Sequence, residues 1–550
     1  MTSENAKKII YLNASVTLLS QFVQVLLGFA IRKFFVDKLG VEYLGYNSVF
    51  SNILQMLNLA DLGIGVAITS FLYKPIINKD EQRINALMYI YKRVYHVMGL
   101  LVSGVGIIVL IIIPVIIPDA QCSDSYLRLL FTINLIGTIS TYFLAYKRTL
   151  LIAEQKSYLV MAIDTIFYIL CSLLQIIVLF CIPNYLVYLF LNVFKNVISN
   201  IVLVFVCNKN NEFLSKENID KNVVDEYKKP ILNYVKDLFV SRIGGFVYYG
   251  TDNIIISVFK GSLLVGFLSN YTMVTNLVNN LIIQVLSSLQ ATYGQYISSE
   301  EDIKKQKQMT DNYIFINYLV GNFCMNCILF LIQPFVEMYF GMHYVLSNEI
   351  VILLSVNFLL TIMMQIPSQV FVVYKLYHYD YPVVIVSAIL NIIISISLVI
   401  KLGIAGVLLG TLVTSLVYLF SRYFIISRYV FKCSYWKYLI KIGRYFLITI
   451  ITLVIEYVAS SRFGLNSWPL FIIKGMLVGL ISILVPFILS LRIEEIDFVR
   501  NEILLMKIKK RNVLLYILIL MVLMVGALIL VGQNLDNSGY KVAYGNKPLF

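Results

Sequence analysis

Two stripes of polar residues run through long apolar stretches of this 550-residue chain, and they limit the possible folds more than any other feature. The stripes are Ser48, Ser51, Gln55, Asn58 and Ser269, Thr272, Asn276, Asn279. Spacings of three or four place each stripe on one helix face, and the two differ by a constant shift (269 − 48 = 221). Unpaired polar groups in hydrocarbon cost several kcal/mol, so these faces are predicted to line a central hydrophilic path. Contact with neighbouring helices is the alternative interpretation.

The composition indicates an integral membrane protein. Hydrophobic residues make up 59% of the chain and charged residues 13%, with a mean hydropathy of +0.82. Soluble domains have about 45–50% apolar and about 25% charged residues. The net charge of +14 does not indicate a nucleic-acid partner, because the basic residues lie in short segments between apolar spans. Cys324 and Cys327 have a metal-like spacing without a second pair, so packing is predicted and no metal is expected.

Apolar segments of about 20 residues divide the chain into membrane spans. Two sets of six are predicted near 9–33, 43–72, 88–117, 124–150, 157–182, 184–207 and near 230–257, 262–295, 310–335, 347–373, 379–400, 403–428. The predicted fold is all-α, with two six-helix bundles plus helices 13 and 14. The predicted units are an N-lobe (1–207), a cytoplasmic linker (208–229), a C-lobe (230–432), helices 13 and 14 (433–490), a basic amphipathic helix (491–511), a fifteenth span (512–532) and a tail (533–550).

A shift of 221 also relates two glycine pairs, Gly40 with Gly45 and Gly261 with Gly266. An even number of spans separates the copies, which predicts a parallel repeat of the two bundles. Basic residues, among them Arg422, gather in alternate connections between spans, whereas the other connections are poor in them. By the positive-inside rule this places the N-terminus in the cytoplasm. The polar start, MTSENAKKII, does not predict a cleaved signal peptide.

Charged residues inside spans are the first candidates for function. Arg242 and Lys195 lie near mid-depth of their spans, and Arg32 ends the first span. A cavity with such cations suits an anionic head group such as a diphosphate, because Arg and Lys form charge-assisted bonds with its oxygens. The alternative is internal pairing of Lys195 or Arg242 with Asp61 or Asp164.

The remaining site predictions divide into two groups. The predicted substrate contacts from the stripes are Gln55, Asn58, Asn276 and Asn279. The predicted candidates for proton or sodium coupling are Asp61, Asp164 and Asp252, and no other cofactor is expected. The chain lacks a Gly-rich phosphate loop, a His-Glu-x-x-His motif and a Gly-x-Ser-x-Gly motif, so neither ATP-driven transport nor enzymatic activity is predicted.

Three segments carry a family resemblance: FVDKLGVEYLGYNSVFSNILQMLNLADLGIGVAITSFLYKPI, YGTDNIIISVFKGSLLVGFLSNYTMV and KLGIAGVLLGT. They resemble the bacterial polysaccharide repeat-unit flippases (O-antigen and capsule) of the multidrug/oligosaccharidyl-lipid/polysaccharide exporter superfamily, over roughly residues 8–490. The resemblance implies a V-shaped cavity with alternating access in the bacterial cytoplasmic membrane. The implied substrate is an undecaprenyl-diphosphate-linked oligosaccharide, moved to the outer leaflet. Arg32 and Asp252 fall in family-like segments.

The resemblance leaves some features open. The fifteenth span departs from the usual fourteen and suggests a further partner, such as polysaccharide polymerase or chain-length machinery. A lipid II flippase and a drug/cation antiporter are alternatives of the same fold, and the antiporter predicts a more anionic cavity. A membrane glycosyltransferase or polysaccharide polymerase, with Asp37 and Glu42 as its acidic pair, is an alternative of another class. The short outer connections disfavour it.

Overall fold

The computed structural model describes residues 3–58, 61–215, 223–228, 230–231, 250–374, 376–460 and 467–490. Within these ranges some side chains are not described, that of Asp61 among them. The described regular structure is helical throughout and contains no strand. The predictions for residues 491–550, which are the amphipathic helix, the fifteenth span and the tail, lie outside the described residues.

The N-lobe, defined as α1 to α8, forms the first bundle. Its helices are α1 (Ser3–Leu39), α2 (Val41–Leu57), α3 (Asp61–Asn78), α4 (Glu81–Ile116), α5 (Asp124–Leu144), α6 (Tyr146–Ala153), α7 (Ser157–Cys181) and α8 (Tyr185–Asn210). A short 3₁₀ helix, η2 (Glu212–Ser215), follows. Two predicted spans are each divided into two helices. Residues 43–72 fall on α2 and α3, and residues 124–150 fall on α5 and α6, which separate at Ala145.

The C-lobe, defined as α10 to α16, forms the second bundle, and α17 and α18 follow it. The elements are α10 (Asp252–Lys260), α11 (Ser262–Ser299), α12 (Ile303–Phe340), η3 (Met342–Tyr344), α13 (Asn348–Met363), α14 (Gln365–Val373), α15 (Tyr377–Leu402), α16 (Ile404–Ile425), the π-helical turn η4 (Ile426–Val430), α17 (Tyr435–Ser460) and α18 (Trp468–Leu489). Most of the predicted span 230–257 lies outside the described residues, which resume at 250.

Local sequence explains where several helices begin. A side-chain oxygen at the residue before the helix accepts a hydrogen bond from a backbone N–H of the first turn, which would otherwise lack a partner. The capping residues and their helices are Asp80 for α4, Ser123 for α5, Asn184 for α8 and Asp302 for α12.

Eleven membrane-crossing candidates are found among the described helices by length and hydropathy. Their outer faces carry large exposed apolar side chains. On α4 these include Leu100, Ile107, Ile111 and Val115, which are 66%, 59%, 67% and 68% exposed. Such a surface is stable against lipid tails and costly in water. The helices α2, α3 and α11 are not among the eleven, and α2 and α11 hold the two polar stripes.

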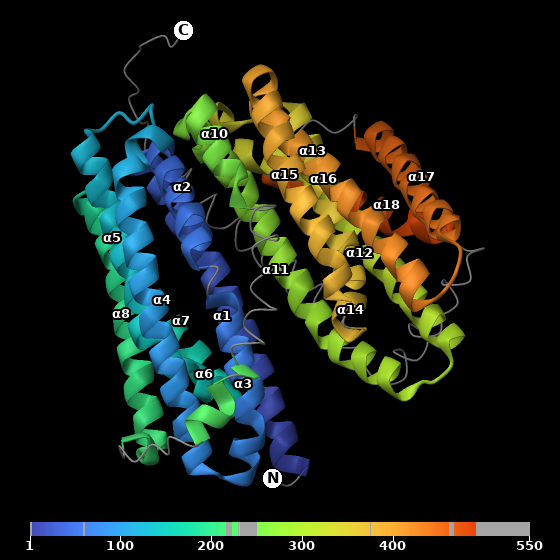
Figure 1. Cartoon of the computed structure of the whole chain (residues 1–550). Coiled ribbons are helices and arrows are strands. Elements are labelled where there is room, and N and C mark those ends of the chain that lie inside the picture. The colour runs from blue at the N-terminus through green and yellow to red at the C-terminus, as the bar shows by residue number, and fades with distance from the viewer. Residues whose placement is uncertain are drawn as a thin grey trace.

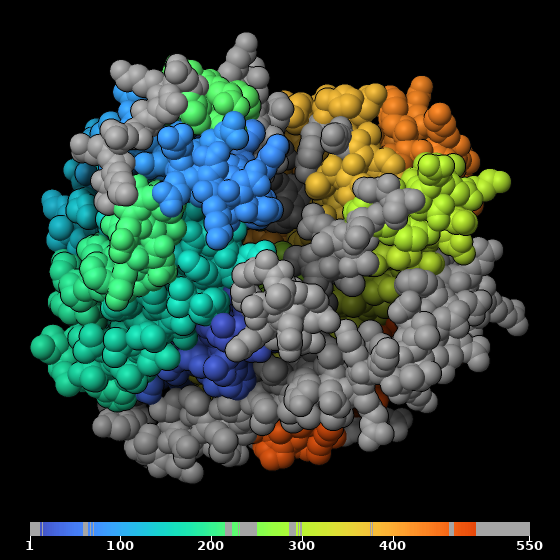
Figure 2. Space-filling view, turned by 90° about the horizontal axis from the view of Figure 1, so that it is seen from below, coloured from blue at the N-terminus to red at the C-terminus, as the bar shows by residue number. Residues whose placement is uncertain are grey.

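The two lobes form a V (Figure 1). They lie closest together at the end where α2 and α11 begin, which we call the closed end, and further apart at the opposite, open end, where the N-terminus lies. Figure 2 views the molecule from the open end and shows a hollow between the blue-to-green N-lobe and the yellow-to-orange C-lobe. The α2 and α11 helices, which carry the stripes, contact one another across the lobe boundary.

A close crossing of α2 and α11 holds the closed end. A Cβ atom at Gly45 would lie 2.0 Å from the carbonyl oxygen of Ser262, and one at Gly266 would lie 2.3 Å from the carbonyl oxygen of Val41. Val41 and Ser262 are themselves related by the repeat (262 − 41 = 221). The contact is therefore exchanged between the two copies, as expected for parallel repeats about an axis that runs between the lobes.

The connection between α4 and α5 adds polar contacts to the closed end. Asp119 accepts hydrogen bonds from the backbone N–H of Ser262 at 3.0 and 2.9 Å, one to each carboxylate oxygen. Its side chain thereby caps α11, a helix of the other lobe. The hydroxyl of Ser257 on α10 donates to the carbonyl of Ile116 at 2.8 Å. Gly261, which precedes α11, has a φ of 95° that favours glycine.

Candidate functional site

A pocket of about 290 Å³ opens between α1, α2, α7 and α8 of the N-lobe, and Met273 of α11 completes it from the C-lobe. Glycine and apolar side chains form part of the wall. The polar lining residues are Arg32, Asn47, Tyr168, Gln175, Tyr188 and Asn192. Among the described residues, Arg32 is the one charged side chain of the lining and no carboxylate belongs to it. The electrostatic field of these side chains therefore favours an anion.

Arg32 links the two lobes within this pocket. Its Nε–H donates to the Asn270 side-chain oxygen at 3.0 Å, and a terminal N–H donates to the Ser269 hydroxyl at 2.5 Å. Both acceptors are neutral and lie on α11. Of the described carboxylates, none lies within ion-pair distance of Arg32, and its other N–H groups have no acceptor among the described residues. The guanidinium thus keeps its charge and its remaining N–H donors for a ligand.

Lys195 lies directly behind the pocket. Its Nζ is 5.2 Å from the ring centre of Tyr168, which is a cation–π distance, and that same ring belongs to the pocket wall. The alternative pairing with Asp164 is not made, because Asp164 forms an ion pair of 2.8 Å with Arg148 of α6. Among the described residues Lys195 has no carboxylate partner. Arg242 and the side chain of Asp61 lie outside the described parts of the chain.

The stripes divide into positions with different surroundings. Gln55 on α2 and Asn276 on α11, which are equivalent by the repeat, are both exposed. Ser269 is instead buried at the lobe boundary, where it accepts from Arg32. Exposure at equivalent positions of two facing helices is the arrangement that a polar path between the lobes requires.

Two other stripe residues have partly or wholly internal surroundings. Asn58 at the end of α2 accepts a hydrogen bond of 2.8 Å from the hydroxyl of Tyr142 on α5, so it joins two N-lobe helices. The side-chain oxygen of Asn279 on α11 is buried and has no hydrogen-bond partner in the described structure. Periodicity alone does not separate such positions from the exposed ones.

A second polar cluster lies in the C-lobe around Asp252, where α10, α15 and α16 meet. One oxygen of Asp252 accepts from the Thr411 hydroxyl at 3.0 Å, and the other is buried without a partner. The Asn391 side chain donates to Thr411 and Thr414, both at 3.3 Å, and its own oxygen is buried without a partner. Carboxylate, hydroxyl and amide oxygens are ligands suited to a hard cation. The described structure contains no group of three or more His, Cys, Asp or Glu side chains that could hold a metal ion.

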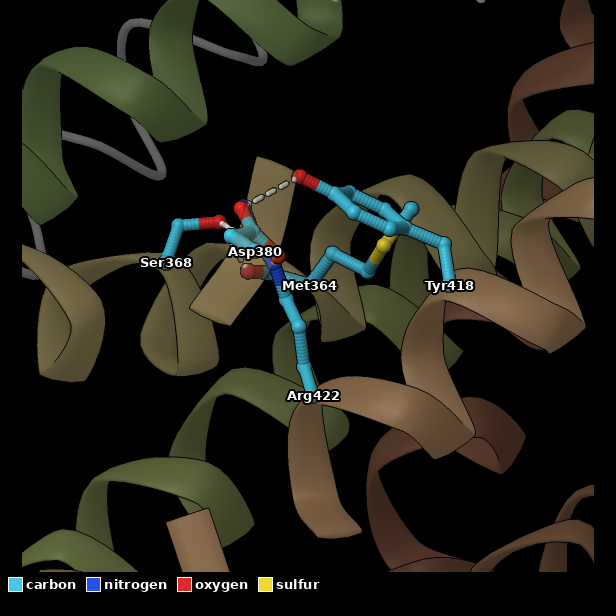
Figure 3. A network of polar contacts seen from close by, with 5 residues as sticks. All are labelled: Met364, Ser368, Asp380, Tyr418 and Arg422. Atoms are coloured by element: carbon cyan, nitrogen blue, oxygen red, sulfur yellow. Dashed lines mark hydrogen bonds and ion pairs between the residues drawn. The ribbon is translucent and has the colours of Figure 1, made fainter. Parts of the chain in front are cut away.

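A buried ion pair, which the sequence pattern did not reveal, joins α15 and α16 of the C-lobe (Figure 3). Arg422 on α16 contacts Asp380 on α15 at 2.6 Å, Tyr418 donates to the same carboxylate at 3.0 Å, and Arg422 donates to Ser368 on α14. The charge pattern groups Arg422 with the cations of the connections between spans, yet it is 6% exposed. The sequence did contain a signal for this pair, because Asp380 and Arg422 place opposite charges inside two consecutive predicted spans.

The acidic residues proposed for an enzyme are both engaged in local contacts. Glu42 accepts from the Tyr46 hydroxyl and, at 3.0 Å, from the backbone N–H of Gln121. Asp37 pairs with Lys33 at 3.5 Å, one helical turn away. Glu42 thereby joins α2 to the connection between α4 and α5, whereas the Asp37 pair lies within α1.

Comparisons with known proteins give a family match and a shared fold. The family model described as polysaccharide biosynthesis protein matches residues 10–293, which is more than half of the chain. A comparison with curated protein sequences found no significant match to this chain.

Solved structures of transporters share the fold. The lipid II flippase MurJ in an inward closed conformation has a TM-score of 0.60 at 14% identity, covering 86% of this chain and 98% of its own. An inward-facing multidrug resistance MATE family transporter has a TM-score of 0.57 at 17% identity, covering 76% and 98%. A superfamily transporter from Pyrococcus furiosus, titled for the reverse polarity of its binding pocket, has a TM-score of 0.51 at 16% identity, covering 78% and 97%.

Proposed function

Because the chain belongs to the polysaccharide biosynthesis protein family, we propose that it flips an undecaprenyl-diphosphate-linked oligosaccharide repeat unit across the bacterial cytoplasmic membrane. The family and the fold make it a multi-pass membrane transporter of the flippase and multidrug exporter superfamily. The proposal adds the substrate, its movement from the cytoplasmic to the outer leaflet, and its use in surface polysaccharide synthesis. Polymerase or chain-length machinery would then receive the product.

Arg32 is the observation that carries the proposal. It places a cation without a carboxylate partner in a pocket at the lobe boundary. Carrying an ionised diphosphate through hydrocarbon would cost many kcal/mol, and charge-assisted bonds to a guanidinium offset that cost. The diphosphate would replace Ser269 and Asn270 as acceptors for Arg32. Substrate binding would thereby remove two contacts that join the lobes at the closed end, which favours opening of that end.

We propose two further cations for the head group, Lys195 and Arg242. The proposed polar contacts along the path of the head group are Gln55, Asn58, Asn276 and Asn279. Lys195 lies behind Tyr168, within one side chain of the pocket. Movement of the Tyr168 ring would let the ammonium group approach a bound phosphate.

The polarity of the pocket argues against a drug/cation antiporter. A cationic drug needs anionic groups at its site, and the described lining offers Arg32 and no acid. Asp37 and Glu42 each bind a partner of their own, which argues against their acting together as the acidic pair of an enzyme. A lipid II flippase would need the same diphosphate contacts, so the attached saccharide separates the two candidates.

The proposed orientation places the N-terminus and the open end in the cytoplasm. Basic residues follow the open-end turns of the N-lobe, including Lys79, Arg83, Lys147 and Lys156. The positive-inside rule assigns such an end to the cytoplasm. The V-shaped conformation then admits a substrate from the cytoplasmic leaflet.

We further propose that the Asp252 cluster couples transport to a proton or a sodium ion. Its two unpartnered oxygens, on Asp252 and Asn391, provide an incomplete ligand set that a cation would complete. Asp164 is a weaker candidate, because Arg148 already neutralises it. In vesicles with an imposed sodium or proton gradient, Asp252→Asn is expected to remove the response to the gradient that drives the wild type. An unchanged response would contradict this role.

The proposal is tested by Arg32→Ala in cells, with Arg128→Ala as the control, because Arg128 is an exposed arginine outside the pocket. Loss of a charge-assisted hydrogen bond of about 1.5–3 kcal/mol lowers diphosphate affinity roughly 10- to 150-fold. We expect Arg32→Ala to lack surface polysaccharide and to retain lipid-linked repeat units on the cytoplasmic face at normal protein level. Normal surface polymer in Arg32→Ala would refute the proposal.

A further inference from the structure

The pocket wall carries hydrogen-bonding side chains that a diphosphate at Arg32 leaves unused. Asn47 on α2 and Tyr188 and Asn192 on α8 line the pocket, and their side chains have no hydrogen-bond partner among the described residues. Gln175 on α7 donates its amide N–H to the backbone carbonyl of Tyr188 at 3.3 Å, and its amide oxygen has no donor in the described structure. Four neutral polar groups on three helices therefore point to a ligand with matching groups.

The chemistry of these groups defines that ligand. Amides and a phenol both donate and accept hydrogen bonds, as sugar hydroxyls do. Removing a polar group from water costs free energy unless the group forms a new hydrogen bond. A ligand that offers matching donors and acceptors therefore binds these side chains more tightly. The ring of Tyr188 is fixed by an edge contact with Phe35, with centroids 4.9 Å apart and planes at 70°. An ordered aromatic ring beside amides provides a surface for the C–H face of a pyranose.

The size of the pocket limits how much of a glycan it holds. Its volume of about 290 Å³ lies at the lower end of the range of roughly 300–1,000 Å³ that small-molecule sites span. That size suits about one sugar ring, and the rest of a longer glycan would lie outside the pocket. Arg32 lines the same pocket, so a sugar bound there lies next to a phosphate held by the guanidinium.

We propose that the pocket is a subsite for a neutral pyranose, the sugar attached directly to the diphosphate, which is bound by Asn47, Gln175, Tyr188 and Asn192. This inference rests on the proposed flippase function and names the part of the substrate that the N-lobe recognises. The rest of the glycan extends into the hollow between the lobes, away from these side chains. Discrimination between glycans with different first sugars is then a property of this pocket.

Two short-chain probes test the subsite on the purified full-length protein by calorimetric titration. One is citronellyl diphosphate, and the other is citronellyl diphosphate linked to a single N-acetylglucosamine. We expect the wild type to prefer the glycosylated probe. Tyr188→Phe and Asn192→Leu are each expected to weaken its binding about threefold to tenfold, the effect of one lost hydrogen bond, and to leave the bare diphosphate unaffected. Retained binding of the bare probe shows that a variant is folded.

Tyr185→Phe is the matched control, because Tyr185 precedes Tyr188 on α8 and has a buried hydroxyl outside the pocket lining. It is expected to bind both probes as the wild type does. Equal affinity of the wild type for the two probes, or equal weakening of both by Tyr188→Phe and Asn192→Leu, would overturn the subsite alone. Failure of the wild type to bind either probe, or binding of both unchanged in Arg32→Ala, would instead refute the diphosphate site.

Discussion

Gly45→Ala is expected to open the closed end, because this position has no room for a side chain. The added Cβ would lie 2.0 Å from the Ser262 carbonyl oxygen, whereas real Cβ contacts essentially never fall below 3.0 Å. The helices α2 and α11 must therefore separate by about 1 Å (3.0 − 2.0 = 1.0). The neighbour is backbone, so no side-chain rotation relieves the contact. Overpacking of this kind raises the free energy of the closed state by about 2 kcal/mol. The open state, in which the two helices are apart, is not destabilised.

A free-energy difference of about 2 kcal/mol raises the ratio of open to closed molecules roughly 30-fold. A reporter cysteine at Met273, which lines the pocket, measures this ratio in a background that lacks the seven native cysteines. A membrane-impermeant maleimide is applied only from the side of the closed end. Its labelling rate is proportional to the open population and should rise by the same factor.

Two comparisons make this result specific to the crossing. Gly104→Ala on α4 is the control, because a Cβ there meets no atom within 4 Å. The double variant Gly45→Ala with Gly266→Ala should label little faster than the single variant, since one separation relieves both contacts. If Gly45→Ala and Gly104→Ala label at the same rate, the crossing does not hold the closed end and the reasoning fails.

Three further substitutions test the polar contacts. Arg422→Ala leaves Asp380 buried without its cation, so the protein should lose about 3–5 kcal/mol of stability and melt at a lower temperature in detergent. A melting temperature equal to that of the wild type would contradict a structural role for this pair. Glu456→Met should raise the melting temperature, because the carboxyl group is fully buried without a hydrogen-bond partner in the described structure, and an apolar side chain of similar length removes the cost of burying it. A lowered melting temperature would show that the charge is compensated. Asp119→Ala removes the cap on Ser262, worth about 1 kcal/mol, and should increase maleimide labelling of the pocket roughly fivefold. Unaltered labelling would show that the cap does not contribute to closure.

The repeat and the fold class were predictable because membrane spans and stripes are properties of a sequence window. A polar residue on an apolar helix reveals its face through spacing, so spacing alone places Gln55 and Asn276 on related faces. The shift of 221 also shows that Gly45 and Gly266 are equivalent positions. It does not show that they allow the two helices to cross closely, because the carbonyl that each glycine approaches belongs to the other lobe.

Partners across the fold were not predictable from the sequence. Nothing in the local pattern shows that Asn58 accepts from Tyr142, or that Asp164 pairs with Arg148 and not with Lys195. These contacts join helices whose relative rotation is decided by packing of the whole bundle. The amide side chains of the pocket were not predictable for the same reason. Asn47 and Gln175 are single polar residues, and only the meeting of four N-lobe helices brings them together.

Flipping by the purified protein in vesicles tests the account most directly. A fluorescent short-chain prenyl diphosphate-linked saccharide is placed in both leaflets, and a membrane-impermeant quencher follows its movement between them. Vesicles with the wild type should exchange the lipid between leaflets, whereas vesicles with Arg32→Ala should behave like protein-free vesicles. Equal exchange by the wild type and Arg32→Ala, or no exchange by the wild type, would contradict a carrier that moves the diphosphate through the Arg32 pocket.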